Sequence, residues 1–259
     1  MKGILSACFS VLLGCYFSAA QPREKRDKFP SYFGLIAAPV FPTNVLGDKT
    51  SIFRDSTQTM TTTFNQKTGY MFGASVRIGL TKRISIETGL TQIRRNFSVN
   101  HSIPDSSVLE TKTFSFVSYD IPINGLVYVQ LTENIYMNAA LGVSISHYPS
   151  DIIDTIRPGG KNFLTQEGRR IKRTWFSFNA GIGFEYRTEK SGTFYIGGAG
   201  KVPLLPIMFG VGIMNQVGTS QRLVAYGPVD GSYLSVDIRY YFPNLRNKGT
   251  QFKPGPIEQ

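Results

Sequence analysis

The sequence predicts an all-β protein, an eight-stranded antiparallel transmembrane β-barrel of the outer-membrane type with long outer loops and short periplasmic turns. Three observations predict it. Apolar and polar residues alternate along most of the chain, long and short connections alternate between these runs, and composition is unusual. Charged residues make up 17% and aromatic residues 13%. Soluble domains carry about 25% charged residues, whereas a barrel wall averages lipid-facing and lumen-facing positions along each strand.

Residues 1–20 are typical of a cleavable signal peptide. Lys2 precedes an apolar run from Ile4 to Phe17, and Ser18-Ala19-Ala20 offers the small residues that a signal peptidase reads. We therefore expect export from the cytoplasm and a mature chain that begins at Gln21.

Both cysteines, Cys8 and Cys15, lie inside this signal. The mature chain would then contain no thiol for a disulfide, a zinc site or a nucleophile. One alternative stays open, because Leu12-Leu13-Gly14-Cys15 resembles a bacterial lipobox. In that case Cys15 would become a lipidated N-terminus.

Period-2 alternation is clearest in Tyr70–Leu80, Phe176–Tyr186 and Leu234–Phe242. Each run has about the 9–11 residues that a tilted transmembrane strand needs. Counting all such runs predicts eight strands, at residues 31–41, 68–80, 83–99, 110–131, 135–148, 173–187, 193–205 and 231–242.

The connections between these runs alternate in length. The long ones are 42–67, 100–109, 149–172 and 206–230, and the short ones are 81–82, 132–134 and 188–192. Long outer loops and short periplasmic turns are typical of bacterial outer-membrane barrels. We therefore expect a periplasmic N-terminal segment at 21–30, the barrel at 31–242 and a periplasmic C-terminal tail at 243–259.

Two segments resemble a known family. Tyr119-Asp120-Ile121-Pro122-Ile123, followed by a strand, a turn and Met137-Asn138-Ala139-Ala140-Leu141-Gly142, resembles the Y-L-E-I-P-L … G-x-x-x-G stretch of the Bacteroidota outer-membrane β-barrel domain, which includes PorT-like proteins. Arg239-Tyr240-Tyr241-Phe242 resembles the signal by which barrel-assembly machinery recognises its clients.

The chain departs from the family in two places. Asp120 replaces the usual glutamate, and the chain continues for 17 residues past Phe242. The resemblance implies a small outer-membrane barrel and, from its PorT-like members, a link to secretion assemblies.

Seven charged residues fall on the inward face of the predicted strands. They are Arg77, Glu87, Asp120, Glu185, Lys201, Asp237 and Arg239. An eight-stranded lumen is just wide enough for side chains to fill, and buried charges persist only when paired. The sequence therefore favours a salt-bridged plug over an ion pathway.

Catalytic, cofactor-binding and metal-binding motifs are not expected. The only histidines are His101, in a predicted outer loop, and His147. Ser146-His147 could suggest a lipid A-modifying enzyme, but adjacent strand residues point to opposite faces. Gly197–Lys201 lacks the spacing of a phosphate-binding loop.

The formal net charge is +11. An exported protein seldom meets nucleic acid, so we expect no nucleic-acid partner. We expect contact with outer-membrane lipid, and the outer cluster Arg169, Arg170, Lys172 and Arg173 could hold lipopolysaccharide phosphates; a solvated basic rim is the alternative. The tail at 243–259 could bind a periplasmic partner.

These observations favour a non-enzymatic scaffold or accessory subunit of an envelope assembly. A small porin-like channel and a lipid A-modifying enzyme are the alternatives within the same fold. A soluble, lipocalin-like barrel is the structural alternative; it would carry apolar residues inside and polar residues outside.

Overall fold

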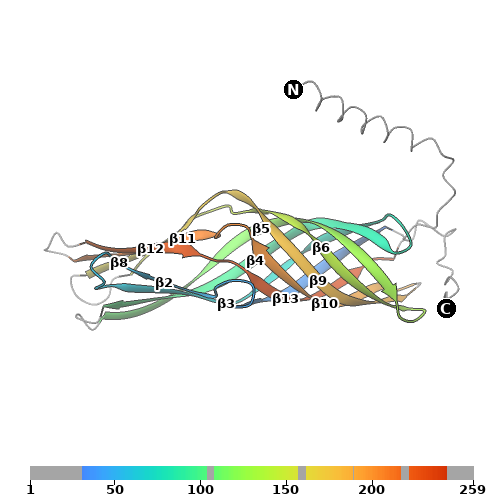
Figure 1. The fold of residues 1–259 in the computed structure, drawn as a ribbon, viewed down its shortest axis with the longest axis horizontal. Coiled ribbons are helices and arrows are strands. Elements are labelled where there is room, and N and C mark those ends of the chain that lie inside the picture. The colour runs from blue at the N-terminus through green and yellow to red at the C-terminus, as the bar shows by residue number, and fades with distance from the viewer. Residues whose placement is uncertain (1–30, 104–107, 157–161, 189, 217–221, 244–259) are drawn as a thin grey trace, which may run out of the picture.

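The structure, a computed structural model, describes residues 31–103, 108–156, 162–188, 190–216 and 222–243 (Figure 1). All regular secondary structure in these ranges is strand: β1 (Tyr32–Pro42), β2 (Thr50–Arg54), β3 (Thr61–Gly79), β4 (Ile84–Ile103), β5 (Val108–Gln130), β6 (Ile135–His147), β7 (Ile152–Ile156), β8 (Asn162–Arg170), β9 (Thr174–Thr188), β10 (Gly192–Pro203), β11 (Met208–Gln216), β12 (Arg222–Val229) and β13 (Tyr233–Tyr241). The prediction of an all-β fold is confirmed.

The predicted signal peptide at 1–20, the segment 21–30 and residues 244–259 of the predicted tail lie outside the described residues. In the part of the chain that is described, no helix is long and apolar enough to cross a membrane.

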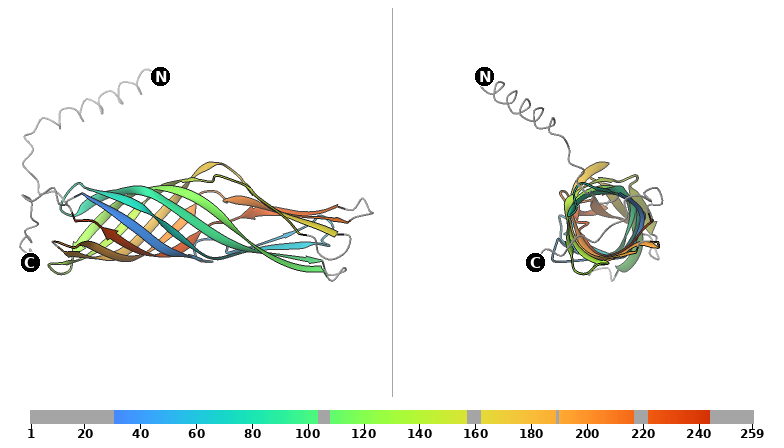
Figure 2. Two further views of the ribbon diagram at one scale, coloured as in Figure 1. Left: turned by 180° about the vertical axis from the view of Figure 1, so that it is seen from behind. Right: turned by 90° about the vertical axis from the view of Figure 1, so that its right-hand side faces the viewer.

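The main sheet closes on itself. Its hydrogen-bonded order is β1-β13-β10-β9-β6-β5-β4-β3, and β3 pairs in turn with β1. All these pairings are antiparallel, and the closing one runs from Tyr32 opposite Arg77 to Val40 opposite Gly69. The end-on view in Figure 2 shows the resulting ring. Closure matters because it leaves no unpaired strand edge in this part of the molecule.

Short connections gather at one end of the ring. The Leu80 N–H donates to the Ile84 carbonyl at 3.0 Å, and the Leu131 N–H donates to the Ile135 carbonyl at 2.9 Å. Gly192 follows the third connection with φ of 84°, a backbone conformation that glycine adopts without steric cost. These are the connections that the sequence predicts to be short.

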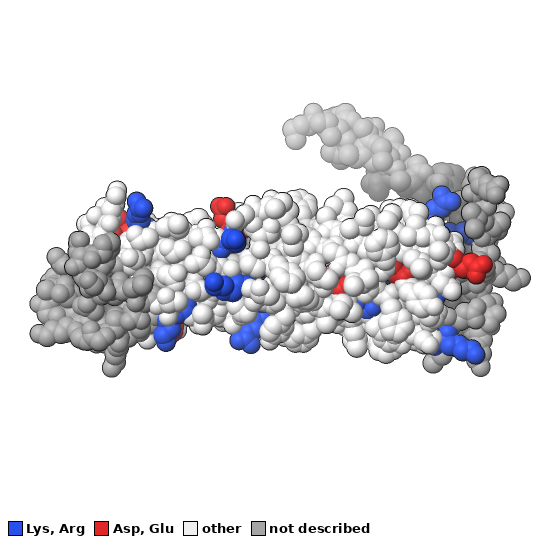
Figure 3. All heavy atoms as spheres, turned by 90° about the horizontal axis from the view of Figure 1, so that it is seen from below, with Lys and Arg blue, Asp and Glu red and all other residues white. Residues whose placement is uncertain are grey.

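The wall of the ring has its apolar side outward. Along β3, Phe72, Val76 and Ile78 are exposed, whereas Met71, Ser75 and Arg77 are buried. We call the exposed large apolar side chains of the ring strands the apolar belt; it includes Phe33, Leu35, Phe72, Ile78, Leu90, Ile121, Ile123, Leu141, Phe178, Ile182, Ile196, Val236 and Ile238. Figure 3 shows a broad, mostly uncharged zone along one face of the molecule.

The end opposite the short turns carries a second β structure, which we call the head. It consists of β2, the segments 61–67 of β3, 96–103 of β4 and 108–117 of β5, and a separate antiparallel sheet in the order β12-β11-β8-β7. Figure 1 shows these strands extending the ring along its long axis.

An apolar core lies between the two faces of the head. Its main cluster consists of Phe64, Phe97, Val99, Phe116, Tyr148, Ile207, Met208 and Val229. A second cluster joins Met60, Leu164, Met214 and Ala225. Phe64 also explains a glycine on the opposite sheet, because a Cβ on Gly210 would lie 2.6 Å from the Phe64 ring. Burial of apolar surface at about 25 cal/mol per Å² stabilises this head.

The prediction that residues 42–67, 100–109, 149–172 and 206–230 are long loops is wrong. They contain β2, parts of β3, β4 and β5, and β7, β8, β11 and β12. Residues 61–66 of β3 show the reason. They alternate between partly buried and buried, and the buried ones are Thr62, Phe64 and Gln66. Two of these three inward residues are polar. Hydropathy therefore does not alternate there, although the backbone does.

Candidate functional sites: the charged lumen and the basic rim

Arg77 stands at the centre of the lumen network and is fully buried. Its Nη2 donates to Glu87 Oε2 at 2.9 Å and to the Tyr241 hydroxyl at 2.6 Å, and its Nη1 donates to Glu185 Oε1 at 2.6 Å. In the ring order, β3 and β9 are separated by three strands on either side. The Arg77–Glu185 pair therefore bridges opposite walls of the lumen.

Two further arginines complete this tier. Arg239 pairs with Glu87 and, at 2.6 Å, with Asp237. Arg187 pairs with Glu185 at 2.6 Å, and its guanidinium lies 3.8 Å from the centroid of the Tyr136 ring. Each carboxylate of the tier thus has at least one cationic partner, which is what burial of charge requires.

A second tier lies nearer the head. Lys201 on β10 pairs with Asp120 on β5. Arg95 donates to the Ser118 hydroxyl at 2.9 Å and to the Gly231 carbonyl at 3.2 Å, and lies 5.1 Å from the centroid of the Tyr233 ring. Arg95 is fully buried and forms no ion pair with the carboxylates of the described residues.

The structure thus brings the seven sequence-predicted lumen residues together in pairs. Sequence reasoning missed two members, Arg95 and Arg187, although the signal was present. Both lie an even number of residues from a predicted inward residue, Arg95 from Glu87 and Arg187 from Glu185, and a strand repeats its facing every two residues. The described lumen therefore carries five bases and four acids, not three and four.

A cavity of about 80 Å³, lined by both charged and apolar side chains, lies between the tiers. Glu87, Asp120, Lys201, Asp237 and Arg239 all line it. Asp120 Oδ1 has no hydrogen-bond partner among the described residues. The cavity is large and polar enough to hold a few water molecules, which need polar partners of this kind.

The inward side chains of β4 change from charged to apolar where the lumen meets the head. Glu87 and Arg95 belong to the charged tiers, and the next inward residues, Phe97 and Val99, belong to the apolar core of the head. All four are at most 2% exposed. The axis of the ring therefore passes from paired charges into a packed apolar core.

The four residues of the predicted outer basic cluster do not behave alike. Arg169 pairs with Glu167 at 2.5 Å, and Arg170 pairs with Asp151 at 3.3 Å. Arg170 also donates to the Tyr148 carbonyl at 3.0 Å. Because nearby carboxylates neutralise these two guanidinium groups, they are poor candidates for binding a further anion.

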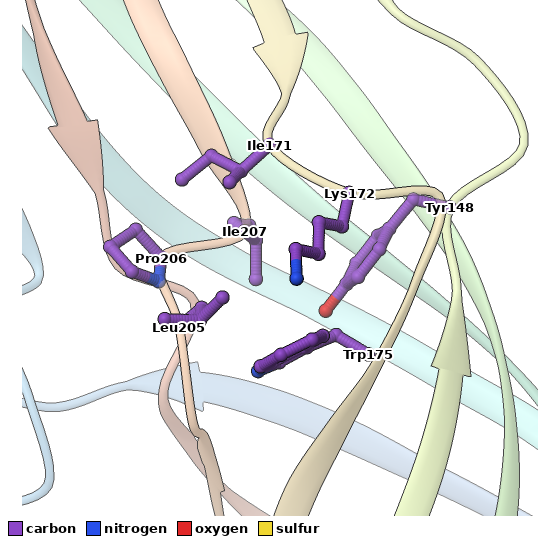
Figure 4. A pocket seen from close by; sticks show the side chains of 7 residues that line it. All are labelled: Tyr148, Ile171, Lys172, Trp175, Leu205, Pro206 and Ile207. Atoms are coloured by element: carbon purple, nitrogen blue, oxygen red, sulfur yellow. The ribbon is translucent and has the colours of Figure 1, made fainter.

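Lys172 and Arg173 lie in the connection between β8 and β9, and both are exposed. The Lys172 Nζ lies 4.0 Å from the centroid of the Trp175 ring. Figure 4 shows Lys172 extending between Tyr148 and Ile207, with its Nζ directed toward Trp175. Neither cation forms an ion pair with a carboxylate of the described residues.

Two more exposed cations lie on neighbouring strands where the ring meets the head, Lys67 on β3 and Arg94 on β4. Arg94 Nη1 approaches the Tyr70 hydroxyl at 3.4 Å, and its guanidinium lies 6.0 Å from the centroid of that ring. We call Lys67, Arg94, Lys172 and Arg173 the basic rim. Sequence reasoning missed both: Lys67 has no basic neighbour in the chain, and the single basic neighbour of Arg94 is Arg95, which is buried in the lumen.

The histidines do not form a catalytic arrangement with the residues described. His147 Nδ1 lies 3.0 Å from the Thr174 hydroxyl, while the Ser146 hydroxyl is buried and bonds to the Ser177 hydroxyl at 3.1 Å. They occupy opposite faces of β6, as the alternation predicts.

His101 is not in a loop, as the sequence suggested, but buried in the head with its Nδ1 at 3.0 Å from the Thr62 hydroxyl. Burial lowers the pKa of His101 to about 4. Its imidazole is therefore neutral at pH 7. In the described ranges, no group of three or more histidine, cysteine or acidic residues could hold a metal ion.

No protein-family model and no curated protein matches the chain. Among solved structures it is similar to the outer membrane protein OprG from Pseudomonas aeruginosa, with 11% identity and a TM-score of 0.49, covering 86% of this chain and 100% of that one. It is also similar to the β domain of the Bordetella autotransporter BrkA, with 10% identity and a TM-score of 0.19, covering 82% of this chain and 100% of that one. Because both TM-scores are below 0.5, the description of the fold rests on the strand pairings and the apolar belt of this chain itself.

Proposed function

We propose that the closed ring is an eight-stranded transmembrane β-barrel of a bacterial outer membrane, exported by the signal peptide at residues 1–20. The support is the apolar belt, because so large an exposed apolar surface is unfavourable in water. A run such as Tyr70–Leu80, at about 3.3 Å per residue and tilted by about 40°, spans roughly 25 Å. That is the height of the lipid-facing band of such barrels. The short turns would then face the periplasm and the head the exterior.

Within this membrane the barrel acts as a scaffold or accessory subunit of an envelope assembly. The observation that carries this proposal is the closed lumen: ion pairs bridge opposite walls, and the apolar core of the head continues the axis. What is left to interact is the surface. In the head, Ile52, Ile153 and Tyr226 are 61%, 64% and 68% exposed. Large apolar side chains exposed to water favour a protein partner, and the PorT-like resemblance suggests one linked to secretion.

A pull-down from outer membranes extracted in mild detergent tests the scaffold. We expect the wild-type protein to recover stoichiometric envelope partners. A head variant with Ile52→Ser and Tyr226→Ser should lose them if the head holds the partner, and removal of residues 243–259 should lose them if the tail does. The matched control is Thr113→Ser, also exposed on the head but already polar. Recovery of the wild-type barrel alone would contradict the scaffold.

A small channel is the second candidate, and the cavity of about 80 Å³ between the charged tiers is the observation that favours it. Planar-bilayer recordings separate the two functions. A plugged barrel gives no conductance steps at neutral pH, whereas steady unitary steps from the wild-type protein would replace the scaffold by a channel.

We propose no catalytic activity. The Ser146 and His147 side chains point to opposite faces of their strand and do not form a nucleophile–base pair. Lipid A isolated from cells with and without the gene should have the same mass spectrum. A difference in lipid A mass that corresponds to an added acyl group or to a group removed by hydrolysis would support the enzyme instead.

A further inference from the structure

The apolar belt ends sharply on the side of the head. Tyr70 on β3, Tyr119 on β5 and Phe176 on β9 are exposed large apolar residues at this edge. Beyond them the same strands turn polar outward: Asn96 accepts a hydrogen bond from the Ser115 hydroxyl at 2.8 Å, and His147 meets Thr174 at 3.0 Å. In a membrane this edge lies where hydrocarbon gives way to lipid head groups.

The basic rim follows this edge. Arg94 is opposite Val117 on β5, two residues from Tyr119, which is opposite His147; His147 is opposite Thr174, the neighbour of Arg173. Arg94 and Arg173 are thus three strand spacings apart, or about 14 Å at about 4.8 Å per spacing. Figure 3 shows several Lys and Arg residues, with an acidic residue beside them, where the uncharged zone ends on the side away from the short turns.

The cations of the rim differ from several cations in the head. Arg169, Arg170 and Lys112 each have a carboxylate partner, at 2.5, 3.3 and 4.0 Å. Arg94, Lys172 and Arg173 have aromatic or solvent contacts instead, and no ion pair within the described ranges. Unpaired cations at a membrane edge can donate charge-assisted hydrogen bonds to phosphate oxygens.

We propose that the basic rim binds the phosphate groups of lipopolysaccharide in the outer leaflet. Arg94 supplies one contact and the Lys172–Arg173 pair supplies the other, so that a glycolipid with more than one phosphate bridges β4 and β9. Of the cluster that the sequence suggested, only Lys172 and Arg173 belong to this site, since Arg169 and Arg170 are paired internally. This inference rests on the proposed membrane orientation.

Trp175 makes the site measurable, because it is the only tryptophan of the chain and lies directly beneath the Lys172 ammonium. The full chain is inserted in phosphatidylcholine nanodiscs and titrated with lipopolysaccharide while Trp175 fluorescence is recorded. We expect a saturable change, because a phosphate that engages Lys172 alters the cation over the indole ring. Enzymatically dephosphorylated lipopolysaccharide and inorganic phosphate should give no saturable change in the same range.

The decisive comparison uses two variants that each lose three positive charges. R94Q/K172Q/R173Q should weaken binding at least about tenfold, since each cation near an anionic lipid surface contributes measurably. R54Q/K112Q/R169Q, whose substitutions lie in the head, should bind within about twofold of wild type. The single variant R94Q leaves the Lys172–Trp175 contact intact and should still weaken binding.

The outcomes separate two failures. A chain that does not insert into nanodiscs refutes the proposed barrel, and the inference falls with it. A chain that inserts but binds both glycolipids equally, responds to inorganic phosphate alone, or loses the same affinity in both triple variants refutes the lipopolysaccharide site and leaves the barrel standing.

Discussion

The ring and the head are built from the same strands but have opposite surfaces. Along β4, Leu90 is 54% exposed in the ring while Glu87 is 2% exposed; in the head, Phe97 is 1% exposed and Asn100 faces outward. The backbone alternates in the same way throughout. The proposed membrane location explains the difference, since lipid favours apolar side chains outside and water favours them inside.

This contrast teaches that the medium, and not the strand, decides which face is apolar. In the proposed orientation the outer surface of the ring faces lipid and that of the head faces water, which accounts for the apolar side chains outside the ring and inside the head. The following substitutions break or sharpen the contrast, from the largest expected effect to the smallest.

Arg77→Met should destabilise the ring by about 3–5 kcal/mol, because it leaves Glu87 and Glu185 buried without this partner. Urea unfolding in lipid vesicles measures the loss. Arg83→Met, in an exposed turn, is the matched control and should change stability by less than about 0.5 kcal/mol. Equal stability of the two variants would mean that the lumen network does not hold the ring.

Phe64→Ala should destabilise the head by about 3 kcal/mol, because it opens a cavity in the main apolar cluster. The loss should be confined to the head, so that limited proteolysis cleaves the head while the ring stays protected. If the ring and the head unfold together at the same urea concentration, the two regions form one cooperative unit. They would then differ in their surfaces but not in their stability.

Leu141→Arg should cost about 2–4 kcal/mol in lipid, because a cation would face hydrocarbon from the apolar belt. The paired variant Ile153→Arg should cost less than about 0.5 kcal/mol, because its site faces water. Leu141 is 71% and Ile153 is 64% exposed, so burial in the protein does not distinguish them. Similar costs for both variants would argue that the belt does not contact lipid.

Acid should weaken the head through His101. Because burial lowers the pKa of His101 to about 4, below about 6.5 for the unfolded chain, the unfolded state binds more protons between these values. Stability is therefore complete well above pH 6.5 and falls as pH drops toward 4, by about 3 kcal/mol. Urea unfolding at pH 7 and pH 4.5 measures this, and His101→Asn should remove that part of the pH dependence. An unchanged pH profile in the variant would show that other groups cause it.

Lys112→Gln should change stability by at most about 0.5 kcal/mol, because its pair with Asp154 spans 4.0 Å and both side chains are largely exposed. It is the surface counterpart of Arg77→Met. A loss above about 1 kcal/mol, measured by urea unfolding, would indicate that this pair holds β5 against β7.

The strands of the ring could be predicted from the sequence because outward and inward residues alternate regularly along them. In Tyr70–Leu80 every second residue is apolar or aromatic, and the residues between, apart from Met71, are small or charged. The same period places Arg77 inward, and it would have placed Arg95 and Arg187 there as well. The head escaped prediction because its inward residues mix Phe64 with Thr62 and Gln66.

The basic rim is a second feature that the sequence alone did not predict correctly. A run of basic residues at 169–173 drew attention in the sequence, but ion pairs with Glu167 and Asp151 neutralise Arg169 and Arg170. Arg94 is an ordinary residue in the chain and becomes part of a candidate site only through the register of its strand with its neighbours.

By itself, the sequence determined the all-β class, the antiparallel runs and the inward direction of the lumen charges, because side-chain direction along a strand is a local property with a period of two. Only the tertiary structure decided that the outer segments fold into a head, and which cations are left unpaired. Those features depend on contacts between residues far apart in the chain, such as Arg77 with Glu185, and no local pattern encodes which partner a side chain will meet.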